Sequence, residues 1–372
     1  MTDISVVIPH NRGGGTYSAS ISHIRALKEG GYDVNSFVVF GKDSSDNEHI
    51  KLLKSYVSYL NPFSLLSAII KFRNKTSKNV IAMHFDSIIF CFLMKKIFRL
   101  DVNVYAFIHT NMPAYYSSLM GIKKIIFKRI LLLMNGIEGV VFLTEDQVEW
   151  FQKNFLYKVD LKVVCIPNPY IPKINNTTVF GSPIDDKGRH GFVFLGRLSQ
   201  EKNVDFIIKA FSIYCCLGGS DNLYIYGDGS EREKLSKLII SLKLHDRITL
   251  CGNTSNPVDA LHRARTLVTA SQIEGFPVVL LEALDAQLNI ITSNCSSACY
   301  ELFDLDGVVE REFHGEHISI LDVPWQDECI SKYGKEMRRL SENAPPNKYE
   351  SSKYLSKYKA EVIFKLWVET FK

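Results

Sequence analysis

The sequence lacks the features that mark secreted, disulfide-bonded or membrane-spanning proteins. Its eight cysteines include no C-x-x-C pair, and its longest uncharged apolar run, Ile88 to Met94, has seven residues. A membrane-spanning helix needs about 20 such residues. The first ten residues, MTDISVVIPH, contain neither a basic segment nor a long apolar one, so they predict a strand and not a secretion signal. We therefore expect reduced cysteines that mostly pack, no zinc site and a cytoplasmic location.

The charge is small overall but unevenly distributed. The chain has 372 residues, enough for two domains, and a net charge of +4. Between Lys51 and Arg129 there are thirteen lysines and arginines and two aspartates, a local charge of +11 that leaves −7 for the rest. Large apolar residues are interleaved with these cations, as in GIKKIIFKRILLL. This pattern predicts amphipathic helices on an anionic membrane, and ordinary solvated helices are the alternative. We expect no nucleic-acid partner.

Short apolar runs alternate with helical patterns along the chain, which predicts parallel sheets covered by helices on both faces. In the first half, strands are expected at 4–9, 32–40, 80–83, 103–108 and 139–143. In the second half, strands are expected at 192–195, 223–226, 248–250, 267–270 and 289–293, and helices at 204–217, 230–242 and 278–286. The Pro- and Asn-rich segment 170–190 predicts a linker.

Two further helices are predicted from local patterns. In the segment 144–155, Thr144 is a suitable N-cap, and Gln147 stands three residues later as its capping-box partner. The tail, 349–372, reads as one long helix.

Two glutamates flank a predicted helix start in SQIEGFPVVLLEALDA. Glu274 lies in the loop after the apolar run 266–270, and Glu282 lies on a helix that begins near Pro277. Proline is favoured at the first helical position, so the N–H groups of Val278 and Val279 are expected to point out of the helix start. Such a terminus attracts phosphate, and open α/β sheets bind ligands outside the carboxyl ends of their strands. Two carboxylates beside an anion site suit a ligand that has both hydroxyls and phosphates, such as a nucleotide sugar.

Two cations are expected at the same sheet edge. Arg197 and Lys202 follow the predicted strand 192–195 and stand five residues apart. One loop can therefore direct both at a single diphosphate, the arginine as a planar fork and the lysine as a point charge.

Together these segments resemble the nucleotide-binding domain of retaining glycosyltransferases of family 4, which have the GT-B fold. The matching pieces in the second half are GRLSQEKN (196–203), YGDGSEREKL (226–235), ITLCG (248–252) and SQIEGFPVVLLEAL (271–284). In the first half, FLTE (142–145) and IPNP (166–169) also match. The resemblance implies an α/β protein with two facing Rossmann-like domains. It implies an acceptor- and membrane-facing domain at 1–170, a donor domain at 171–354, and a C-terminal helix at about 355–372 that crosses back to the first domain.

The resemblance also implies roles for individual residues. Arg197 and Lys202 would hold the donor diphosphate, Glu282 the ribose hydroxyls and Glu274 the transferred sugar. His109, in FIHTNM, would touch the donor sugar and complete the catalytic set. The other donor-binding positions would be Gly14, Gly15, Gly196, Gly227, Leu250, Gly275, Phe276, Pro277, Val278 and Val279. The role of His84, in AMHFDS, stays open.

The segment SNCSSACYEL (293–302) lacks the glycines usual in the family, and the sequence departs from the family pattern at four single positions. Asn203 stands for a glycine, Leu250 for a phenylalanine, and Gln287 and Asn289 for a glycine and a proline. All four are expected around the donor pocket, so the identity of the donor stays open.

The resemblance implies hexose transfer, with retention, from a UDP- or GDP-linked sugar to a hydroxyl of a glycan or lipid-linked glycan. Bacterial surface polysaccharide or lipopolysaccharide synthesis at the inner membrane leaflet would be the setting, without metal or cofactor. A nucleotide-sugar epimerase and a non-catalytic membrane-binding protein are alternatives. An NAD-dependent oxidoreductase is another, although GGGTYS (13–18) and GDGSER (227–232) lack the third glycine of the dinucleotide fingerprint. We expect no metal at the acidic pair Asp304 and Asp306.

Overall fold

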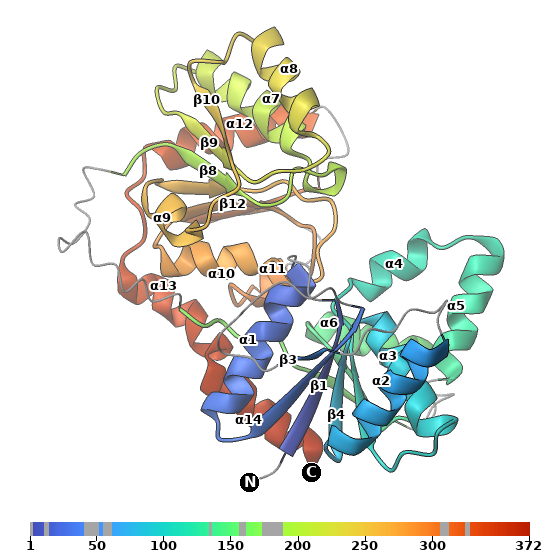
Figure 1. Ribbon diagram of the computed structural model, residues 1–372. Helices are drawn as coiled ribbons and strands as arrows, with labels where there is room; N and C mark the ends of the chain where they lie inside the picture. The colour runs from blue at the N-terminus through green and yellow to red at the C-terminus, as the bar shows by residue number, and fades with distance from the viewer. Residues whose placement is uncertain are drawn as a thin grey trace. The chain divides into compact units, whose positions relative to one another are not determined.

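The computed structural model describes residues 3–10, 15–40, 52–54, 62–133, 136–155, 161–172, 189–305, 312–323 and 328–372. The chain divides into two α/β units, drawn in Figure 1. Unit 1 comprises residues 1–171 and 357–372, and unit 2 comprises 172–356. Gly14 and most of the predicted linker, 173–188, lie outside the described residues.

Unit 1 is built on a parallel sheet in the order β3-β2-β1-β4-β5-β6-β7. Its strands are β1 (Asp3–His10), β2 (Asp33–Phe40), β3 (Leu52–Lys54), β4 (Asn79–Met83), β5 (Asn103–Phe107), β6 (Gly139–Phe142) and β7 (Lys162–Cys165). Strands such as NVIAM are buried at nearly every position, which is the pattern of a parallel sheet covered on both faces. The strand order reverses between β1 and β4, which pair with Ile4 beside Asn79. Ligands bind at such reversals, outside the carboxyl ends of the strands.

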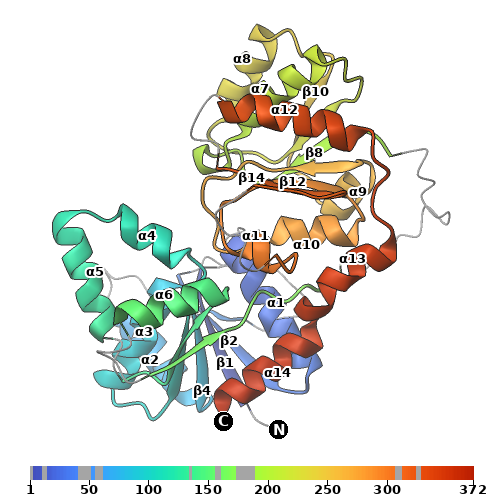
Figure 2. The ribbon, with the colours of Figure 1, turned by 180° about the vertical axis from the view of Figure 1, so that it is seen from behind.

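Helices cover both faces of this sheet. They are α1 (Gly15–Glu29), α2 (Pro62–Lys75), α3 (Phe85–Lys96), α4 (Met112–Ser118), α5 (Gly121–Leu133), α6 (Glu145–Phe155) and α14 (Ala360–Phe371). In Figures 1 and 2, α1 and α14 lie on one face and α2 and α3 on the other. One apolar core joins α2, α3, α5 and α6 to the sheet. Among the described helices, none is both long and apolar enough to cross a membrane.

Unit 2 has a second sheet, in the order β10-β9-β8-β11-β12-β14-β13, with β13 antiparallel to β14. Its strands are β8 (Phe192–Leu195), β9 (Leu223–Tyr226), β10 (Ile248–Gly252), β11 (Thr266–Val268), β12 (Asn289–Ser293), β13 (Phe313–His314) and β14 (Ile318–Leu321). The strand order reverses between β8 and β11, whose pairing places Phe192 beside Thr266.

The helices of unit 2 are α7 (Val204–Cys216), α8 (Arg232–Ser241), α9 (Pro257–His262), α10 (Val278–Asp285), α11 (Ala298–Glu301), α12 (Glu328–Ser341) and α13 (Lys348–Leu355). In Figures 1 and 2, α7, α8 and α12 lie on one side of the sheet, and α9 and α10 lie on the other. The predicted α/β architecture is thus confirmed in both halves.

The prediction of one long C-terminal helix is wrong. Helix α13 ends at Leu355, a 3₁₀ turn follows at Ser356–Tyr358, and Lys359 is extended with φ −61° and ψ 146° before α14 begins. The backbone of Tyr170 causes the break, because its N–H donates to the carbonyl of Tyr358 at 2.7 Å and it pairs with Lys359 as a parallel bridge. A contact between residues so distant in sequence leaves no local signal.

Helix α14 returns to unit 1 and packs along α1, as the resemblance implies. Trp367 is fully buried, and its Nε1–H donates to Nδ1 of His23 at 3.2 Å. Since that nitrogen accepts, the proton of His23 sits on Nε2, which donates to Oδ1 of Asn168 at 3.3 Å. Burial, followed by the charge of His109, keeps the pKa of His23 well below its usual value. The neutral imidazole therefore joins α14, α1 and the segment after β7.

The capping box predicted at α6 forms only in part. The N–H of Gln147 donates to Oγ1 of Thr144 at 3.4 Å, so Thr144 caps the helix as expected. The side-chain amide of Gln147 is buried and has no hydrogen-bond partner among the described residues. The reciprocal bond of a capping box is therefore absent.

Candidate functional site

The candidate residues of unit 2 lie at the reversal of its strand order. Arg197 and Lys202 belong to the loop after β8, and Glu274 belongs to the loop after β11. Because β8 and β11 are neighbours in the sheet, their carboxyl ends meet at the point where open α/β sheets bind ligands.

An ion pair joins the two loops: Nζ of Lys202 contacts Oε1 of Glu274. The two side chains are only 25% and 18% exposed, respectively. A backbone bond runs beside the pair, from the N–H of Gln272 to the carbonyl of Glu201 at 2.8 Å. Residues that the sequence placed separately at one sheet edge are therefore in direct contact.

Glu201, which the sequence analysis did not single out, adds a second carboxylate to this loop. Its Oε1 accepts a hydrogen bond from Oγ of Ser199 at 2.7 Å. Burial opposes ionisation of Glu201, but the bond from Ser199, a backbone N–H and the charges of Lys202 and Arg197 lower its pKa overall. Glu201 is the glutamate of GRLSQEKN, so the motif contained it, but the sequence analysis assigned it no role of its own.

The loop of Arg197 is fixed by the turn after β9. The N–H of Leu198 donates to the carbonyl of Asp228, and the N–H of Glu231 donates to the carbonyl of Leu198, both at 3.0 Å. The turn approaches so closely that a Cβ on Gly227, whose φ is 138°, would lie 1.8 Å from the carbonyl oxygen of Gly196. Gly227 is therefore needed for this close approach, while the Arg197 side chain stays exposed.

A pocket of about 590 Å³ opens beside this turn. Leu250, in β10, lines it together with Asp228 and Arg232. Nη1 of Arg232 is buried and has no hydrogen-bond partner in the described part of the chain.

The start of α10 differs from the prediction. Pro277 is the N-cap, with φ −80° and ψ 84°, and not the first helical residue. This turn lets the N–H of Val278 donate to the carbonyl of Phe276 at 3.0 Å. The N–H of Val278 is therefore already used, and Val279 is left to present its N–H at the helix start.

The segment around Cys295 supports the loop that carries Glu274. The N–H of Glu274 donates to the carbonyl of Cys295 at 3.2 Å, and the carbonyl of Gly275 accepts from Oγ of Ser296 at 3.2 Å. Phe276 is buried beside them. Glu282 lies half-buried on α10, beyond this loop.

Three of the four departures from the family pattern have a structural explanation. Asn203 and Gln287 both have left-handed backbones, with φ 54° and 57°, where the family has glycine. Asparagine tolerates this conformation better than most residues. Asn289 is fully buried, and its Nδ2 reaches the carbonyls of Leu340 and Asn343 at 3.4 Å. Asn203 and Gln287 thus adopt the backbone conformation that glycine favours, and Asn289 ties the start of β12 to the end of α12.

The candidate residues of unit 1 lie at the carboxyl ends of its strands. Gly15 begins α1, shortly after β1, and nothing lies within 4 Å of where its Cβ would be. His109 follows β5, its ring centroid 4.3 Å from that of Phe107 and its Nε2 3.4 Å from Sδ of Met83. Burial, and then the charge of His84, lowers the pKa of His109 to about 3. At neutral pH this imidazole is uncharged and can hydrogen-bond but cannot act as a cationic acid.

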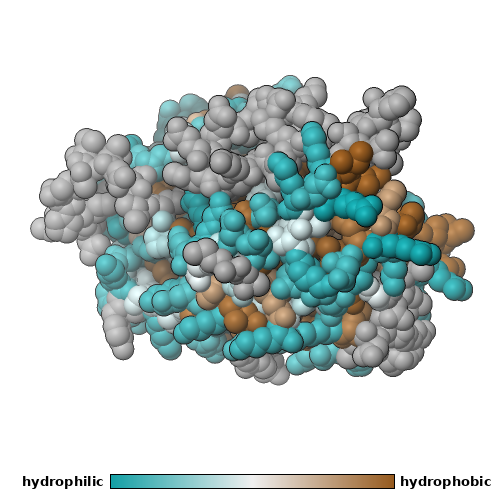
Figure 3. Space-filling model, turned by 60° about the horizontal axis from the view of Figure 1, so that its bottom comes forward, coloured by the Kyte–Doolittle hydropathy of each residue, from teal (hydrophilic) through white to brown (hydrophobic). Residues whose placement is uncertain are grey.

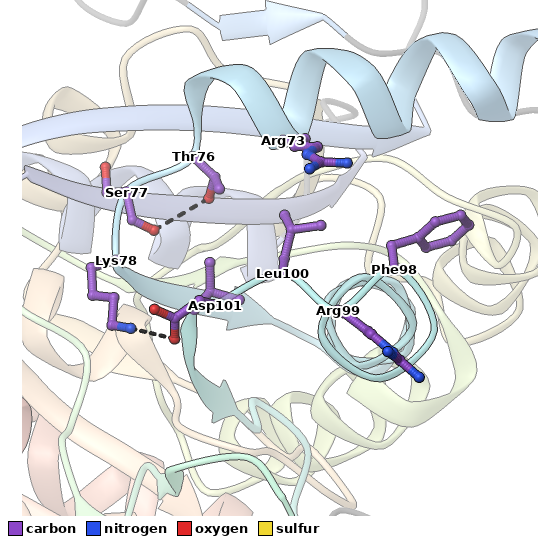
Figure 4. Close-up of a pocket in the computed structure, with 9 residues that line it drawn as sticks. Arg73, Thr76, Ser77, Lys78, Phe98, Arg99, Leu100 and Asp101 are labelled. Atoms are coloured by element: carbon purple, nitrogen blue, oxygen red, sulfur yellow. Dashed lines mark hydrogen bonds and ion pairs between the residues drawn. The ribbon is translucent and has the colours of Figure 1, made fainter.

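A second pocket, of about 340 Å³, lies at the opposite, amino edge of the unit 1 sheet (Figure 4). Arg73, Lys78 and Arg99 supply positive charge there, and Lys78 pairs with Asp101. It is separate from the candidate residues. No group of three metal-ligating side chains occurs among the described residues; of the acidic pair, Asp306 lies outside them.

The fold is that of GT-B glycosyltransferases, which are transferase enzymes. An Anabaena protein, HepE, solved in complex with UDP-glucose, matches 100% of this chain and 99% of its own with a TM-score of 0.72, at 13% identity. The family model of glycosyl transferases group 1 matches residues 178–311, which cover most of unit 2. Over this segment the chain is similar to the glycosyl transferases of group 1.

Relatives of known sequence agree with this class. An uncharacterised glycosyltransferase of Methanocaldococcus jannaschii is 27% identical over 311 residues, which cover 78% of this chain and 75% of the relative. The lipopolysaccharide 1,6-galactosyltransferase of Escherichia coli is 30% identical over 121 residues, 31% of this chain and 33% of that enzyme.

Proposed function

We propose that this protein transfers a hexose from a UDP- or GDP-linked sugar to a hydroxyl of a glycan or lipid-linked glycan, with retention of configuration. The Lys202–Glu274 ion pair at the strand reversal of unit 2 carries the proposal. It places a cation for phosphate and a carboxylate for sugar hydroxyls side by side. The UDP-glucose bound to the Anabaena protein favours UDP, and the lipopolysaccharide enzyme of Escherichia coli favours a surface-polysaccharide acceptor.

The donor would separate the ion pair. Arg197 is exposed and Lys202 is a quarter exposed, so a diphosphate can bind Arg197 first and then draw Lys202 away from Glu274. The released carboxylate then accepts hydrogen bonds from the hexose hydroxyls. Lys202 and Arg197 stabilise the negative charge that grows on the diphosphate as it leaves.

The chemical step needs no nucleophile from the protein. The bond between C1 of the hexose and the diphosphate breaks, and the acceptor oxygen bonds C1 from the same face. A phosphate oxygen of the donor takes the acceptor proton, so the products are the glycoside and a nucleoside diphosphate. His109 stays neutral and hydrogen-bonds the donor sugar. The proposal includes neither metal nor cofactor, and it assigns the donor to 171–354 and the acceptor to 1–170.

We place the enzyme in the cytoplasm, bound peripherally to the anionic inner leaflet through α4 and α5. Met120, Ile122 and Ile125 are 82%, 72% and 62% exposed. Lys123, Lys124 and other cations are interleaved with them, and neither helix contains an acid. Figure 3 shows apolar side chains in brown beside hydrophilic ones in teal, on the side where Figure 1 places α4 and α5. This combination suits an anionic bilayer surface.

The proposal is tested by thermal stabilisation without metal, using UDP, GDP, ADP, CMP and NADH on the wild type and on Arg197→Ala. A ligand at a hundredfold excess over its Kd stabilises the native state by about 2.7 kcal/mol. We expect one nucleoside diphosphate to stabilise the wild type and to lose most of its effect in the variant. Stabilisation by NADH alone would favour the oxidoreductase, and no stabilisation would favour a binding protein. Conversion of the donor sugar to its epimer without an acceptor would favour the epimerase.

A further inference from the structure

The backbone of His84 adopts a conformation that is almost restricted to glycine. Its φ is 74° and its ψ is 162°. The other described non-glycine residues with positive φ have values between 51° and 57°, near the ordinary left-handed region. A residue held where His84 lies costs about 1–3 kcal/mol, and such residues cluster at functional sites.

Two hydrogen bonds impose this conformation. The N–H of His84 donates to the carbonyl of Phe107 at 3.0 Å, which extends the pairing of β4 with β5. The carbonyl of His84 accepts from the N–H of Ile88 at 3.0 Å, which begins α3. Glycine could make both bonds without strain. The backbone geometry therefore does not itself require a histidine at this position.

His84 lies at the edge of the sheet where a ligand of unit 1 is expected. His84 follows β4 directly, and β4 neighbours β1 at the reversal of the strand order. His109 follows β5, the next strand, and the charge of His84 contributes to lowering the pKa of His109. Two half-buried imidazoles thus share the carboxyl edge of the sheet near its reversal.

We propose that the imidazole of His84 binds hydroxyl groups of the acceptor. This inference rests on the proposed function, which assigns the acceptor to unit 1. The ring nitrogens of an imidazole can hydrogen-bond the hydroxyl of a sugar, which both donates and accepts. The two backbone bonds fix the Cα of His84, from which the ring projects, between β4 and α3.

The first test separates strain from function. We expect His84→Gly to raise the midpoint of thermal unfolding by about 2–4 °C, because the strain is released. We expect His84→Ala to bring no such rise, because alanine is strained in the same conformation. Lys243→Gly is the matched control: Lys243 is exposed, has φ 57°, and follows α8 in unit 2. It should gain stability and keep full transfer.

The second test measures transfer. Washed membranes of the producing organism serve as the acceptor, with tritiated UDP-glucose, UDP-N-acetylglucosamine and GDP-mannose as donors. We expect His84→Gly and His84→Ala to lower transfer at least tenfold, with a raised apparent KM for membranes. We expect His84→Asn, which keeps an N–H donor and a carbonyl acceptor, to recover part of the loss. Stabilisation by UDP and the slow hydrolysis of donor by water should stay at wild-type levels.

Full transfer by His84→Gly would overturn the inference. A loss of UDP stabilisation in the same variant would also overturn it, because His84 would then serve the donor. A lower unfolding temperature for His84→Gly would show a structural role for the ring. If the wild type transfers no label from any of the three donors, the proposed function fails and the acceptor role fails with it. If the wild type transfers label and His84→Gly does too, only the inference fails.

Discussion

Replacing Glu274 with glutamine should strengthen the binding of UDP while it weakens glycosyl transfer. In the donor-free protein, Lys202 is held by Glu274, so a diphosphate must separate the pair before it gains the lysine. The variant keeps the size of the side chain and removes its charge. It therefore removes both the competing partner of Lys202 and a negative charge beside the incoming phosphates.

The magnitude follows from the burial of the pair. Two unit charges about 4 Å apart interact by about 4 kcal/mol at an effective dielectric constant of about 20. The side chains of Lys202 and Glu274 are 25% and 18% exposed, so solvent screens part of this interaction. Solvation of the separated carboxylate recovers a further part. We expect a net gain of about 1–2 kcal/mol, which is about 5- to 30-fold in Kd.

Isothermal titration with UDP at low and high salt measures the effect, and donor consumption measures transfer. Transfer should fall by at least a hundredfold, because the hexose loses its carboxylate. The matched control is Glu282→Gln, a carboxylate on α10 that is expected to hold ribose and should weaken UDP binding. Unchanged or weaker UDP binding by a folded Glu274→Gln protein would refute the reasoning. A gain that persists undiminished in high salt would refute its electrostatic origin.

Three further predictions concern stability, membrane binding and pH. Gln287→Gly should raise the free energy of unfolding by about 0.5–1 kcal/mol in urea titrations, because the left-handed strain at φ 57° exceeds the added chain entropy of glycine. Ile125→Glu should lower cosedimentation with phosphatidylglycerol vesicles at least tenfold, whereas Ile240→Glu, equally exposed on α8 of unit 2, should not. The free energy of unfolding should fall as pH drops below about 6.5, by at most about 1.4 kcal/mol per pH unit for His109. The reason is that His109 binds a proton in the unfolded chain but stays unprotonated in the native protein, where its pKa is about 3. Thermal midpoints between pH 5 and 8 should show a shallower slope in His109→Gln, and an unchanged slope would contradict that cause.

Sequence patterns located the buried strands well because parallel strands are continuous apolar runs between polar loops. The predicted strand 192–195 coincides with β8, and 223–226 coincides with β9. The short strands β3, β7, β13 and β14 were missed, since two to four residues carry little periodicity. The division of the tail at Lys359 depends on pairing with Tyr170, a contact that local patterns cannot encode.

The candidate site could be predicted as a set of residues but not as an arrangement. Arg197, Lys202 and Glu274 were assigned to one sheet edge because they follow predicted strands. Lys202 and Glu274 are in contact because β8 and β11 are neighbours in the sheet. The local sequence of either segment does not determine this strand order. The turn at Pro277 was misread because proline also serves as an N-cap. His84 was noted only as a histidine at a strand end, since φ cannot be read from sequence.

The departures from the family pattern bear differently on donor specificity once their geometry is known. Asn203 and Gln287 keep the left-handed backbone of the glycines they replace, and Asn289 points into a buried network with the end of α12. None of these three residues lines the pocket beside the Arg197 loop. Leu250 does line the pocket beside the Arg197 loop, where the family commonly has phenylalanine. A leucine removes a flat aromatic wall, so selectivity among nucleotide bases should respond to substitution at Leu250 and not at the other three positions.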